Sequence, residues 1–588
     1  AVNHTFAKKI KIPELQLWYP IGYGAQNLYE ITVETAEDTK MIETGFRSVR
    51  LVREKLADGE SFLFEVNGIR IFSKGACTVP LDAFLNRITE EDYKFYIQKA
   101  KESNMNMLRI WGGGIYENEE FYAQCDKNGI MVWQDFMFAC AEYPDNIAEF
   151  ADNCRKEIVY NLKRLRCHPC IVLYCGNNEN NWLMQLNTDK ADDYPYSGNY
   201  IYKTVIPECC SKLAADTPYW VSSPYSETGD CNSYKTGDVH EWSVSCYHKD
   251  IEEYEECDGR FISEFGMQAA SHLRTVKEYL PKEERKIMSE MSFNHNKSTG
   301  GIETGLSYII TNVGGYNNFE DYLTLSQFVQ AEGVRLGIEH WRSNKFLTAG
   351  ILFWQFNDNW CTTSYSCIDH RKREKALFYY TKRLYADILV AMKAKGEVLK
   401  ITLVNDRIED VSGILKIKGY TMGGQLVFEQ EDQVQINAND KQVVFEKNIT
   451  SIMESRGKFV YPDYSYKYPS NLNLGCLNVG EVDNLLRDVV FTAELDVDGK
   501  VYTNYKTMVK FRRLRLEKPH IQAQVKGDEI TLMTDKPAFG VYIETDCDSR
   551  LSDNFLFLEP AREYRIKADK PVNAVRVKEL YTMSDKRV

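Results

Sequence analysis

The stretch Ile171-Val172-Leu173-Tyr174-Cys175-Gly176-Asn177-Asn178-Glu179-Asn180 carries the strongest structural signal in this chain. Five largely apolar residues end abruptly in a polar cluster that contains one carboxylate. This profile is typical of a buried parallel strand whose carboxyl end opens into a site. A second stretch, Arg260-Phe261-Ile262-Ser263-Glu264-Phe265-Gly266, also carries a single Glu just past an apolar run. The pattern therefore predicts two carboxylates, Glu179 and Glu264, at strand ends that face one pocket.

Size and charge limit the classes of protein to consider. The chain has 588 residues, which predicts about three to five domains. Its 44% hydrophobic and 27% charged residues are typical of a globular protein. The 72 Lys and Arg against 85 Asp and Glu give a formal net charge of −13, so we expect neither nucleic acid nor an anionic membrane as a partner. No apolar run approaches the ~20 residues of a membrane span.

The cysteines do not form the pattern of a disulfide framework. Sixteen are present, and fourteen of them lie between Cys77 and Cys367, several in strand-like or helical runs. Cys167-His168-Pro169-Cys170 is similar to a metal or redox pair, but no second Cys or His pair lies nearby. We therefore expect buried, reduced thiols and no metal site.

From about residue 60 to 386, apolar strands alternate with helical stretches. The eight strand candidates are Arg70–Ser73, Met107–Trp111, Ile130–Trp133, Ile171–Cys175, Tyr219–Ser222, Val239–Trp242, Arg260–Ser263 and Gly350–Phe356. Helical patterns lie between them, as at Glu90–Ser103, Ile147–Arg166 and Tyr322–Arg342. Eight such units predict a (β/α)8 barrel, whose sites lie at the C-terminal ends of the strands. Glu179 and Glu264 then belong to strands four and seven.

Period-two alternation on both sides of the barrel predicts β-sandwich domains. The fold class is therefore a (β/α)8 TIM barrel flanked by immunoglobulin-like β-sandwiches. Residues 1–59 hold too few strands for a whole sandwich and are expected to be the C-terminal part of one. The other predicted domains are the barrel at 60–390, a sandwich at 391–514 and a C-terminal sandwich at 515–588, the last two divided near the basic run Lys510–Arg515.

Two carboxylates at one barrel mouth fit the hydrolysis of a glycosidic bond. One carboxylic acid protonates the leaving oxygen; in a retaining enzyme the other carboxylate attacks the anomeric carbon, and the two groups lie about 5 to 5.5 Å apart. Asn178 precedes Glu179 and is placed to hydrogen-bond a sugar 2-hydroxyl. Arg109 ends strand two and is placed to hold the nucleophile ionised; a structural Arg at the barrel mouth is the alternative.

Other residues near strand ends are candidates for shaping a sugar pocket. Trp354, at strand eight, is predicted to form the floor under a sugar ring, with core packing as the alternative. The same two roles remain equally open for Trp360. His240 and Trp242 end strand six. We predict a neutral, hydrogen-bonding His240 and not a general base, because the carboxylates already fill that role.

Motifs along nearly the whole chain match one known family. They are Leu17–Gly24, Lys74–Ala76 with Pro80 and Asp82, Arg109–Glu117, Trp133–Ala139 and Gly176–Trp182. On these motifs the chain resembles glycoside hydrolase family 2, and within it the β-mannosidases. Cys77-Thr78-Val79 stands where that family commonly has Asn-Trp-Ile, so the chain departs from the family motif at this strand.

The resemblance implies a role for each matching residue. Glu179 matches the acid/base, Glu264 the nucleophile and Asn178 the residue that contacts the 2-hydroxyl. The expected substrate-binding residues are Arg109, Trp111, Asp135, Asn178, His240, Trp242 and Trp354. The resemblance also implies retention of anomeric configuration, no cofactor, a carbohydrate as partner, and a jelly-roll domain that precedes the first sandwich and is missing here.

The expected function is that of a retaining exo-β-mannosidase that releases terminal mannose from β-mannosides. The alternatives are another family 2 exo-glycosidase such as a β-glucosaminidase, an endo-β-mannosidase, or an inactive carbohydrate-binding barrel. The sequence does not assign a compartment; a bacterial chain would be periplasmic or secreted, and an animal chain lysosomal.

Overall fold

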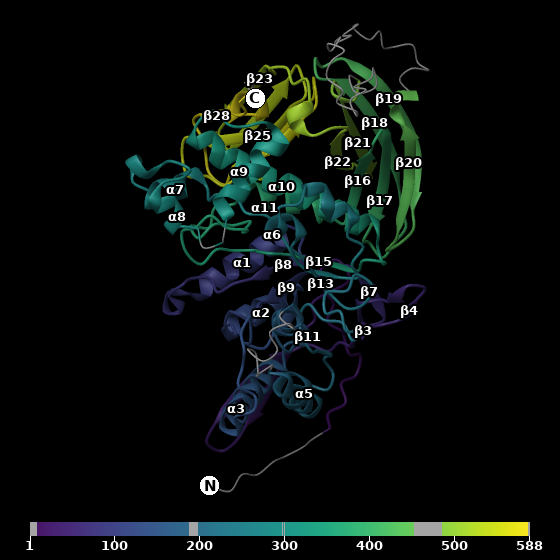
Figure 1. The fold of residues 1–588 in the computed structure, drawn as a ribbon. Coiled ribbons are helices and arrows are strands. Elements are labelled where there is room, and N and C mark those ends of the chain that lie inside the picture. The colour runs from purple at the N-terminus through teal and green to yellow at the C-terminus, as the bar shows by residue number, and fades with distance from the viewer. Residues whose placement is uncertain (1–8, 187–197, 297, 299, 452–484, 586–588) are drawn as a thin grey trace.

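Eight parallel strands form the centre of the computed structural model, which describes residues 9–186, 198–296, 298, 300–451 and 485–585. Helices surround this sheet, and two β-sandwiches lie together on one side of it, at the top of Figure 1. Residues 1–8 of the first predicted domain and 452–484 of the third lie outside the described residues. Within the described ranges, no helix has the length and apolar character needed to cross a bilayer.

The eight strands close on themselves in chain order. They are β8 (Ser73–Thr78), β9 (Met107–Ile110), β10 (Met131–Asp135), β11 (Ile171–Cys175), β12 (Tyr219–Trp220), β13 (Val239–Glu241), β14 (Ile262–Phe265) and β15 (Gly350–Phe353). Each strand except β12 pairs in parallel with the next, and β15 pairs back to β8. Between β12 and β13 the link is made by side chains, because Trp220 Nε1 donates to Asp238 Oδ1 at 2.9 Å. The predicted (β/α)8 barrel is confirmed.

The first barrel strand is not where the sequence pattern placed it. The predicted strand Arg70–Ser73 is wrong: Ile69–Ile71 forms β7, which pairs antiparallel with β6 (Leu63–Val66), and the barrel strand β8 begins at Ser73. Strand β8 has the sequence SKGACT and is buried at all six residues. Its small and polar residues give no apolar run, so hydrophobicity alone did not reveal it. A Cβ at Gly75 would lie 1.8 Å from the Met107 carbonyl oxygen, so the small residue is required there.

Helices cover the outside of the barrel. The principal ones are α1 (Glu90–Glu102), α2 (Glu119–Asn128), α3 (Ala148–Leu165), α5 (Ile206–Leu213), α7 (Leu273–Tyr279), α9 (Gly301–Val313), α10 (Phe319–Ser343) and α11 (Ala376–Leu384). A reciprocal capping box between Thr89 and Asp92 starts α1. Helix α10 is buried over nearly its whole length because it contacts both the barrel strand β15 and the sandwich strand β16 (Ile388–Lys395).

The residues before β8 close the N-terminal end of the barrel. Strands β1 (Tyr29–Glu34) and β2 (Thr39–Thr44) form a hairpin, and β3 (Val49–Val52) pairs with β6. Phe62 and Phe64 are buried at the end of the barrel, where the Phe62 ring lies 5.0 Å from that of Trp220 and 5.6 Å from that of Phe261. The side chains of Phe62 and Phe64 therefore belong to the barrel core. The predicted domain limits remain a proposal.

The two sandwiches each enclose their own core. The first joins the sheet β16, β17 (Val398–Asn405) and β20 (Lys441–Asn448) to the sheet β19 (Leu426–Ile436), β18 (Val411–Thr421), β21 (Val489–Val497) and β22 (Lys500–Thr507). The second joins β23 (Ile521–Lys526), β24 (Glu529–Thr534) and β27 (Tyr564–Lys567) to β26 (Leu556–Leu558), β25 (Ala538–Thr545) and β28 (Val575–Lys578). Antiparallel pairing with alternating burial is what the period-two pattern predicted.

A buried carboxylate joins the barrel to the first sandwich. Asp406 follows β17 and accepts bonds of 2.7 Å from Lys74, Arg342 and Lys345, which belong to the barrel. Burial would raise the pKa of Asp406, but the three cations hold it well below its usual range. The cluster is referred to below as the Asp406 cluster.

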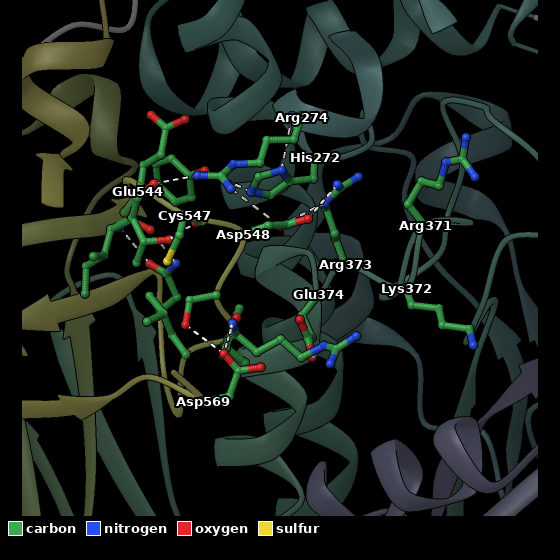
Figure 2. A pocket seen from close by; sticks show the side chains of 18 of the residues that line it. His272, Arg274, Arg371, Lys372, Arg373, Glu374, Glu544, Cys547, Asp548 and Asp569 are labelled. Atoms are coloured by element: carbon green, nitrogen blue, oxygen red, sulfur yellow. Dashed lines mark hydrogen bonds and ion pairs between the residues drawn. The ribbon is translucent and has the colours of Figure 1, made fainter. Parts of the chain in front are cut away.

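The C-terminal sandwich meets the barrel at a cavity of about 280 Å³. Figure 2 shows Arg274 and Arg373, from the barrel, directed at Asp548, which follows β25; the Arg373–Asp548 distance is 2.7 Å. His272 lies in the same wall, with Nε2 at 3.1 Å from the Tyr542 hydroxyl. None of the predicted site residues lines this cavity. Arg373 pairs with Asp548 and Glu374 with Arg550 across this junction, and these ion pairs join the two domains.

The buried Glu117, between β9 and α2, should make the free energy of unfolding depend on pH. It is buried, with the Tyr93 hydroxyl donating to it at 2.8 Å, and burial raises the pKa of Glu117 to about 7. The unfolded chain releases this proton near pH 4.5, so stability is present below that pH and is lost as pH rises through 7. Between pH 5 and 8, wild-type stability should fall by about 3 kcal/mol relative to Glu117→Gln. Urea unfolding at pH 5 and pH 8 measures this change in stability. The exposed Glu142→Gln is the control. The same pH dependence in wild type and Glu117→Gln would contradict the prediction.

Candidate active site

The predicted site residues come together at the C-terminal ends of the barrel strands. Arg109 lies on β9, Asp135 on β10, His240 on β13 and Glu264 on β14, while Asn178 and Glu179 follow β11, Trp111 follows β9, Trp242 follows β13 and Trp354 follows β15. In a (β/α)8 barrel this face carries the site. One end of the barrel thus gathers residues that are more than two hundred positions apart in the chain.

The two carboxylates face each other across His240. Oxygens of Glu179 and Glu264 and a ring nitrogen of His240 all lie within 4.8 Å of one another. His240 Nδ1 is 2.8 Å from Glu179 Oε1 and 3.4 Å from Glu264 Oε2. The Glu179 side chain is 16% exposed and that of Glu264 only 4%. Glu179 therefore stands nearer the solvent, and Glu264 lies deeper in the barrel.

The backbone holds Glu179 in an uncommon conformation. Its φ is +63°, in the left-handed region that non-glycine residues rarely adopt. The Glu179 amide donates to the Ser223 carbonyl at 2.8 Å, and Asn178 donates to Phe138 at 2.9 Å, so neighbouring strand ends fix the turn on both sides. Such strain at a pocket is a mark of functional sites.

Arg109 hydrogen-bonds three other residues of the site. Its Nη1 donates to Glu264 Oε1 at 2.6 Å, and its Nη2 donates to Asp135 Oδ2 at 2.8 Å and to Asn178 Oδ1 at 2.7 Å. The guanidinium is fully buried, so these bonds are little screened by water. Arg109 thus orients one of the two carboxylates and the amide beside the other.

Asp135 supports Arg109 from below. Its side chain has 0% exposure. Its Oδ1 accepts from Trp133 Nε1 at 2.9 Å and its Oδ2 from the Gly112 amide at 3.0 Å, in addition to Arg109. Because the Asp135 carboxylate is enclosed and its bonds run to Arg109, Trp133 and a backbone amide, the geometry favours an indirect role for Asp135.

Burial and nearby charge give the two carboxylates different tendencies to hold a proton. Burial raises the pKa of Glu179 above its ordinary 4.5. Burial also raises the pKa of Glu264, but the Arg109 guanidinium acts in the opposite direction. Glu264 has a cation at 2.6 Å, whereas Glu179 has no charged donor at hydrogen-bond distance in the described structure. A single proton shared by the pair therefore resides on Glu179.

The imidazole between them is neutral. Burial lowers the pKa of His240 to about 4, because the ring is fully enclosed and a charge there would lose its hydration. The prediction of a neutral, hydrogen-bonding His240 agrees with this environment. Its backbone is held by Asn232, whose side chain bonds both the amide and the carbonyl of His240 at 2.9 Å.

Aromatic rings border the polar cluster. Trp111 and Trp354 meet edge to face with centroids 5.0 Å apart, and Trp242 meets Tyr365 at 5.5 Å. All three tryptophans are half-buried, which leaves ring surface for a ligand. Trp360 instead stacks on His295 at 5.3 Å. Its geometry favours packing over the sugar-binding role.

Three residues of the site escaped the sequence analysis. The Cys140 thiol donates to Glu179 Oε2 at 3.4 Å, and Ser223 and Asp238 connect to His240 from behind. Asp238 lies two positions before His240, and the period of a strand places such residues on one face; that signal was available. Cys140 and Ser223 lie in loops whose paths the sequence does not predict.

No metal is assigned to the site. Among the described residues, one group offers three ligand atoms within reach of a single ion, and it consists of Glu179, His240 and Glu264. The Arg109 guanidinium already supplies the positive charge there. Cys167 and Cys170 donate to the carbonyl oxygens of Arg164 and Tyr122 and do not face each other, and the fifteen described cysteines are all free.

Comparisons with known proteins agree with this geometry. Residues 397–512 match the Mannosidase Ig/CBM-like domain family, and residues 516–583 match an Ig-fold domain family. Beta-mannosidase B of Emericella nidulans is 36% identical over 404 residues, which are 65% of this chain and 48% of that protein. Beta-mannosidase B of Neosartorya fischeri is 35% identical over 422 residues, 68% of this chain and 50% of that protein.

Solved structures extend the likeness. A β-D-mannosidase from Dictyoglomus thermophilum has 34% identity and a TM-score of 0.86, over 97% of this chain and 68% of that one. An exo-chitosanase from Amycolatopsis orientalis, at 15% identity and a TM-score of 0.72 over 97% of this chain and 70% of that one, shares the fold.

A (β/α)8 barrel with paired carboxylates on strands four and seven, flanked by immunoglobulin-like domains, has the architecture of a glycoside hydrolase. Within that class the chain belongs to glycoside hydrolase family 2, among the β-mannosidases. It spans about half the length of the curated relatives it matches.

Proposed function

We propose that the chain is a retaining exo-β-mannosidase that releases terminal mannose from β-mannosides. The observation that carries the proposal is the approach of the Glu179 and Glu264 carboxylates to within 4.8 Å at the barrel mouth. This separation corresponds to the roughly 5 to 5.5 Å of retaining enzymes and leaves no room for the water that an inverting enzyme places between its carboxyl groups. The sugar preference rests on the family and on the names of the relatives.

The proposed reaction has two steps. In the first, Glu179 gives its proton to the glycosidic oxygen, the bond from that oxygen to the anomeric carbon breaks, and Glu264 forms a bond to the same carbon. In the second, Glu179 takes a proton from water, and the water oxygen displaces Glu264, which restores both carboxyl groups and the β configuration. Arg109 keeps Glu264 ionised for attack.

The surrounding residues are proposed to bind the terminal sugar. The Asn178 amide stands beside Glu179 and can donate to the 2-hydroxyl, which is axial in mannose. The faces of Trp111, Trp242 and Trp354 offer apolar surface to the ring. Asp135 is proposed to act through Arg109, whose guanidinium it orients.

A panel of nitrophenyl β-glycosides tests the proposal. We expect kcat/KM for the mannoside to exceed those for the glucoside, galactoside and glucosaminide by at least about tenfold, since one mispositioned hydroxyl costs roughly 1 to 3 kcal/mol or more. Proton NMR of a fresh digest should show the β anomer of mannose first. Preference for the glucosaminide would replace the sugar assignment, and α-mannose as first product would exclude retention.

A further inference from the structure

A buried carboxylate behind the site anchors a chain of hydrogen bonds. Asp238, just before β13, has 0% exposure, and no cation lies within ion-pair distance of it among the described residues. Its Oδ1 accepts from Trp220 Nε1 at 2.9 Å and from the Tyr225 amide at 3.1 Å. Its Oδ2 accepts from the hydroxyls of Ser223 and Ser263, both at 2.6 Å. Four donors are the environment of an ionised, acceptor-only carboxylate.

The Ser223 hydroxyl therefore donates its single proton to Asp238. Three acceptors surround that hydroxyl: Asp238 Oδ2 at 2.6 Å, His240 Nε2 at 2.9 Å and Ser263 Oγ at 3.3 Å. An anionic oxygen at the shortest distance is the strongest of these acceptors. Ser223 must then meet His240 with a lone pair, so the proton in this second bond comes from His240 Nε2.

The protonation state of His240 Nδ1 follows from that of Nε2. A neutral imidazole carries one proton, and with that proton on Nε2 the Nδ1 atom is an acceptor. Nδ1 lies 2.8 Å from Glu179 Oε1, at hydrogen-bond distance. Two acceptors do not approach so closely without a proton between them, and the only group that can supply it is the carboxylic acid of Glu179.

We propose that the series Asp238–Ser223–His240, called the Asp238 relay below, fixes the His240 tautomer so that Nδ1 accepts the acid proton of Glu179 and keeps that residue loaded for donation. Within the relay, Ser223 and Asp238 are positioning residues that act through His240. The inference rests on the proposed function, because it assigns Glu179 the role of acid. It adds a physical reason why, of two adjacent carboxyl groups, Glu179 is the one that holds the proton.

Other charged and titratable groups face this proton from several elements. They are Arg109 on β9, Cys140 after β10 and Glu264 on β14. Arg109 bonds Glu264 and not Glu179, and the Cys140 thiol reaches the other oxygen, Oε2, at 3.4 Å. Among the described residues, His240 is thus the nitrogen acceptor at Glu179 Oε1. Changes behind His240 should therefore reach Glu179 and leave the Arg109–Glu264 pair in place.

The tautomer itself can be observed without turnover. In protein labelled with ¹⁵N at histidine, the imidazole nitrogens of His240, assigned by difference with His240→Gln, should show a protonated Nε2 and a bare Nδ1 near pH 6. A protonated Nδ1 in the wild type would overturn the relay, whatever the enzyme activity.

Two variants test the consequence for catalysis. Ser223→Ala removes the acceptor of the Nε2 proton, and Asp238→Asn lets the new amide donate to Ser223, which then donates to Nε2 and reverses the chain. Both place the ring proton on Nδ1, where it stabilises ionised Glu179. The basic limb of the kcat/KM profile should move to lower pH by about one unit, while the acid limb, governed by Glu264, stays in place.

The leaving group separates a relay from a merely structural role. β-Mannobiose needs the acid, and 2,4-dinitrophenyl β-mannoside does not, so on the basic limb Ser223→Ala should lose about tenfold more activity on the first than on the second. Glu179→Gln, which has no acid at this position, gives the largest difference between the two substrates that loss of the acid can produce. Equal losses on both substrates, or an unmoved basic limb in both variants, would overturn the relay. A wild type inactive on every β-mannoside would instead refute the proposed function, and the NMR result would still stand.

Discussion

Glu264→Ala is expected to lower kcat/KM for β-mannosides by on the order of 10⁴-fold or more, about 5.5 kcal/mol of transition-state stabilisation. Glu264, the proposed nucleophile, pairs with Arg109 at 2.6 Å, and the proposed acid Glu179 brings an oxygen to within 4.8 Å of it. Without the attacking oxygen, the covalent intermediate cannot form. The loss is measured with a nitrophenyl mannoside, with circular dichroism confirming that the variant is folded.

Added azide should distinguish the two carboxylates by the product formed. In Glu264→Ala the anion enters the vacated space and attacks from the face opposite the leaving group, so an activated mannoside gives α-mannosyl azide. In the matched variant Glu179→Ala, Glu264 still forms the intermediate, and azide then displaces it to give β-mannosyl azide. The reverse pairing of products and variants would exchange the roles of the two residues.

Asp406→Asn is expected to lower the free energy of unfolding by about 3 to 5 kcal/mol, since it removes a carboxylate that pairs with three buried cations. The amide keeps the shape of the side chain but not its charge. Lys74, Arg342 and Lys345 would then remain close together, desolvated and uncompensated. Urea unfolding monitored by tryptophan fluorescence measures the change.

Two comparisons make the Asp406 experiment specific. Glu409→Gln, an exposed carboxylate three residues further along, should change stability by less than about 0.5 kcal/mol. Adding Lys345→Met to Asp406→Asn should recover part of the loss, because one uncompensated charge is then replaced by an apolar chain. A loss in Asp406→Asn no larger than in Glu409→Gln would show that the cluster contributes nothing to the barrel–sandwich junction.

Much of the fold could be predicted from local pattern. Strand β11 has the predicted bounds, Ile171–Cys175. A strand that is covered on both faces buries every side chain, so it appears in the sequence as a continuous apolar run. The barrel strand β8 could not be found in this way, since its core contacts are made by small and polar residues. Strands β12 and β13 have only two and three residues, and side chains join them instead of a backbone ladder.

Much of the candidate site could be predicted as well. Glu179 follows an apolar strand and Glu264 lies near the end of another, and parallel strands in a closed barrel bring their carboxyl ends to one face. The indirect position of Asp135 was not predictable, because it depends on the bonds that Asp135 makes to Arg109 and Trp133 inside the folded barrel. The Trp360 alternatives were separated only by the ring of His295, 65 positions earlier in the chain.

The order of residues along the chain was enough to establish a barrel, its flanking sandwiches and a pair of carboxylates at one mouth, because strand period and burial are local properties. Which of those carboxylates keeps the proton is not local. That depends on Arg109 reaching Glu264 from β9, and on Asp238 and Ser223 meeting His240 across the gap between β12 and β13. Charge and hydrogen-bond direction act over a few ångströms in space, and only the folded chain brings those atoms within that range.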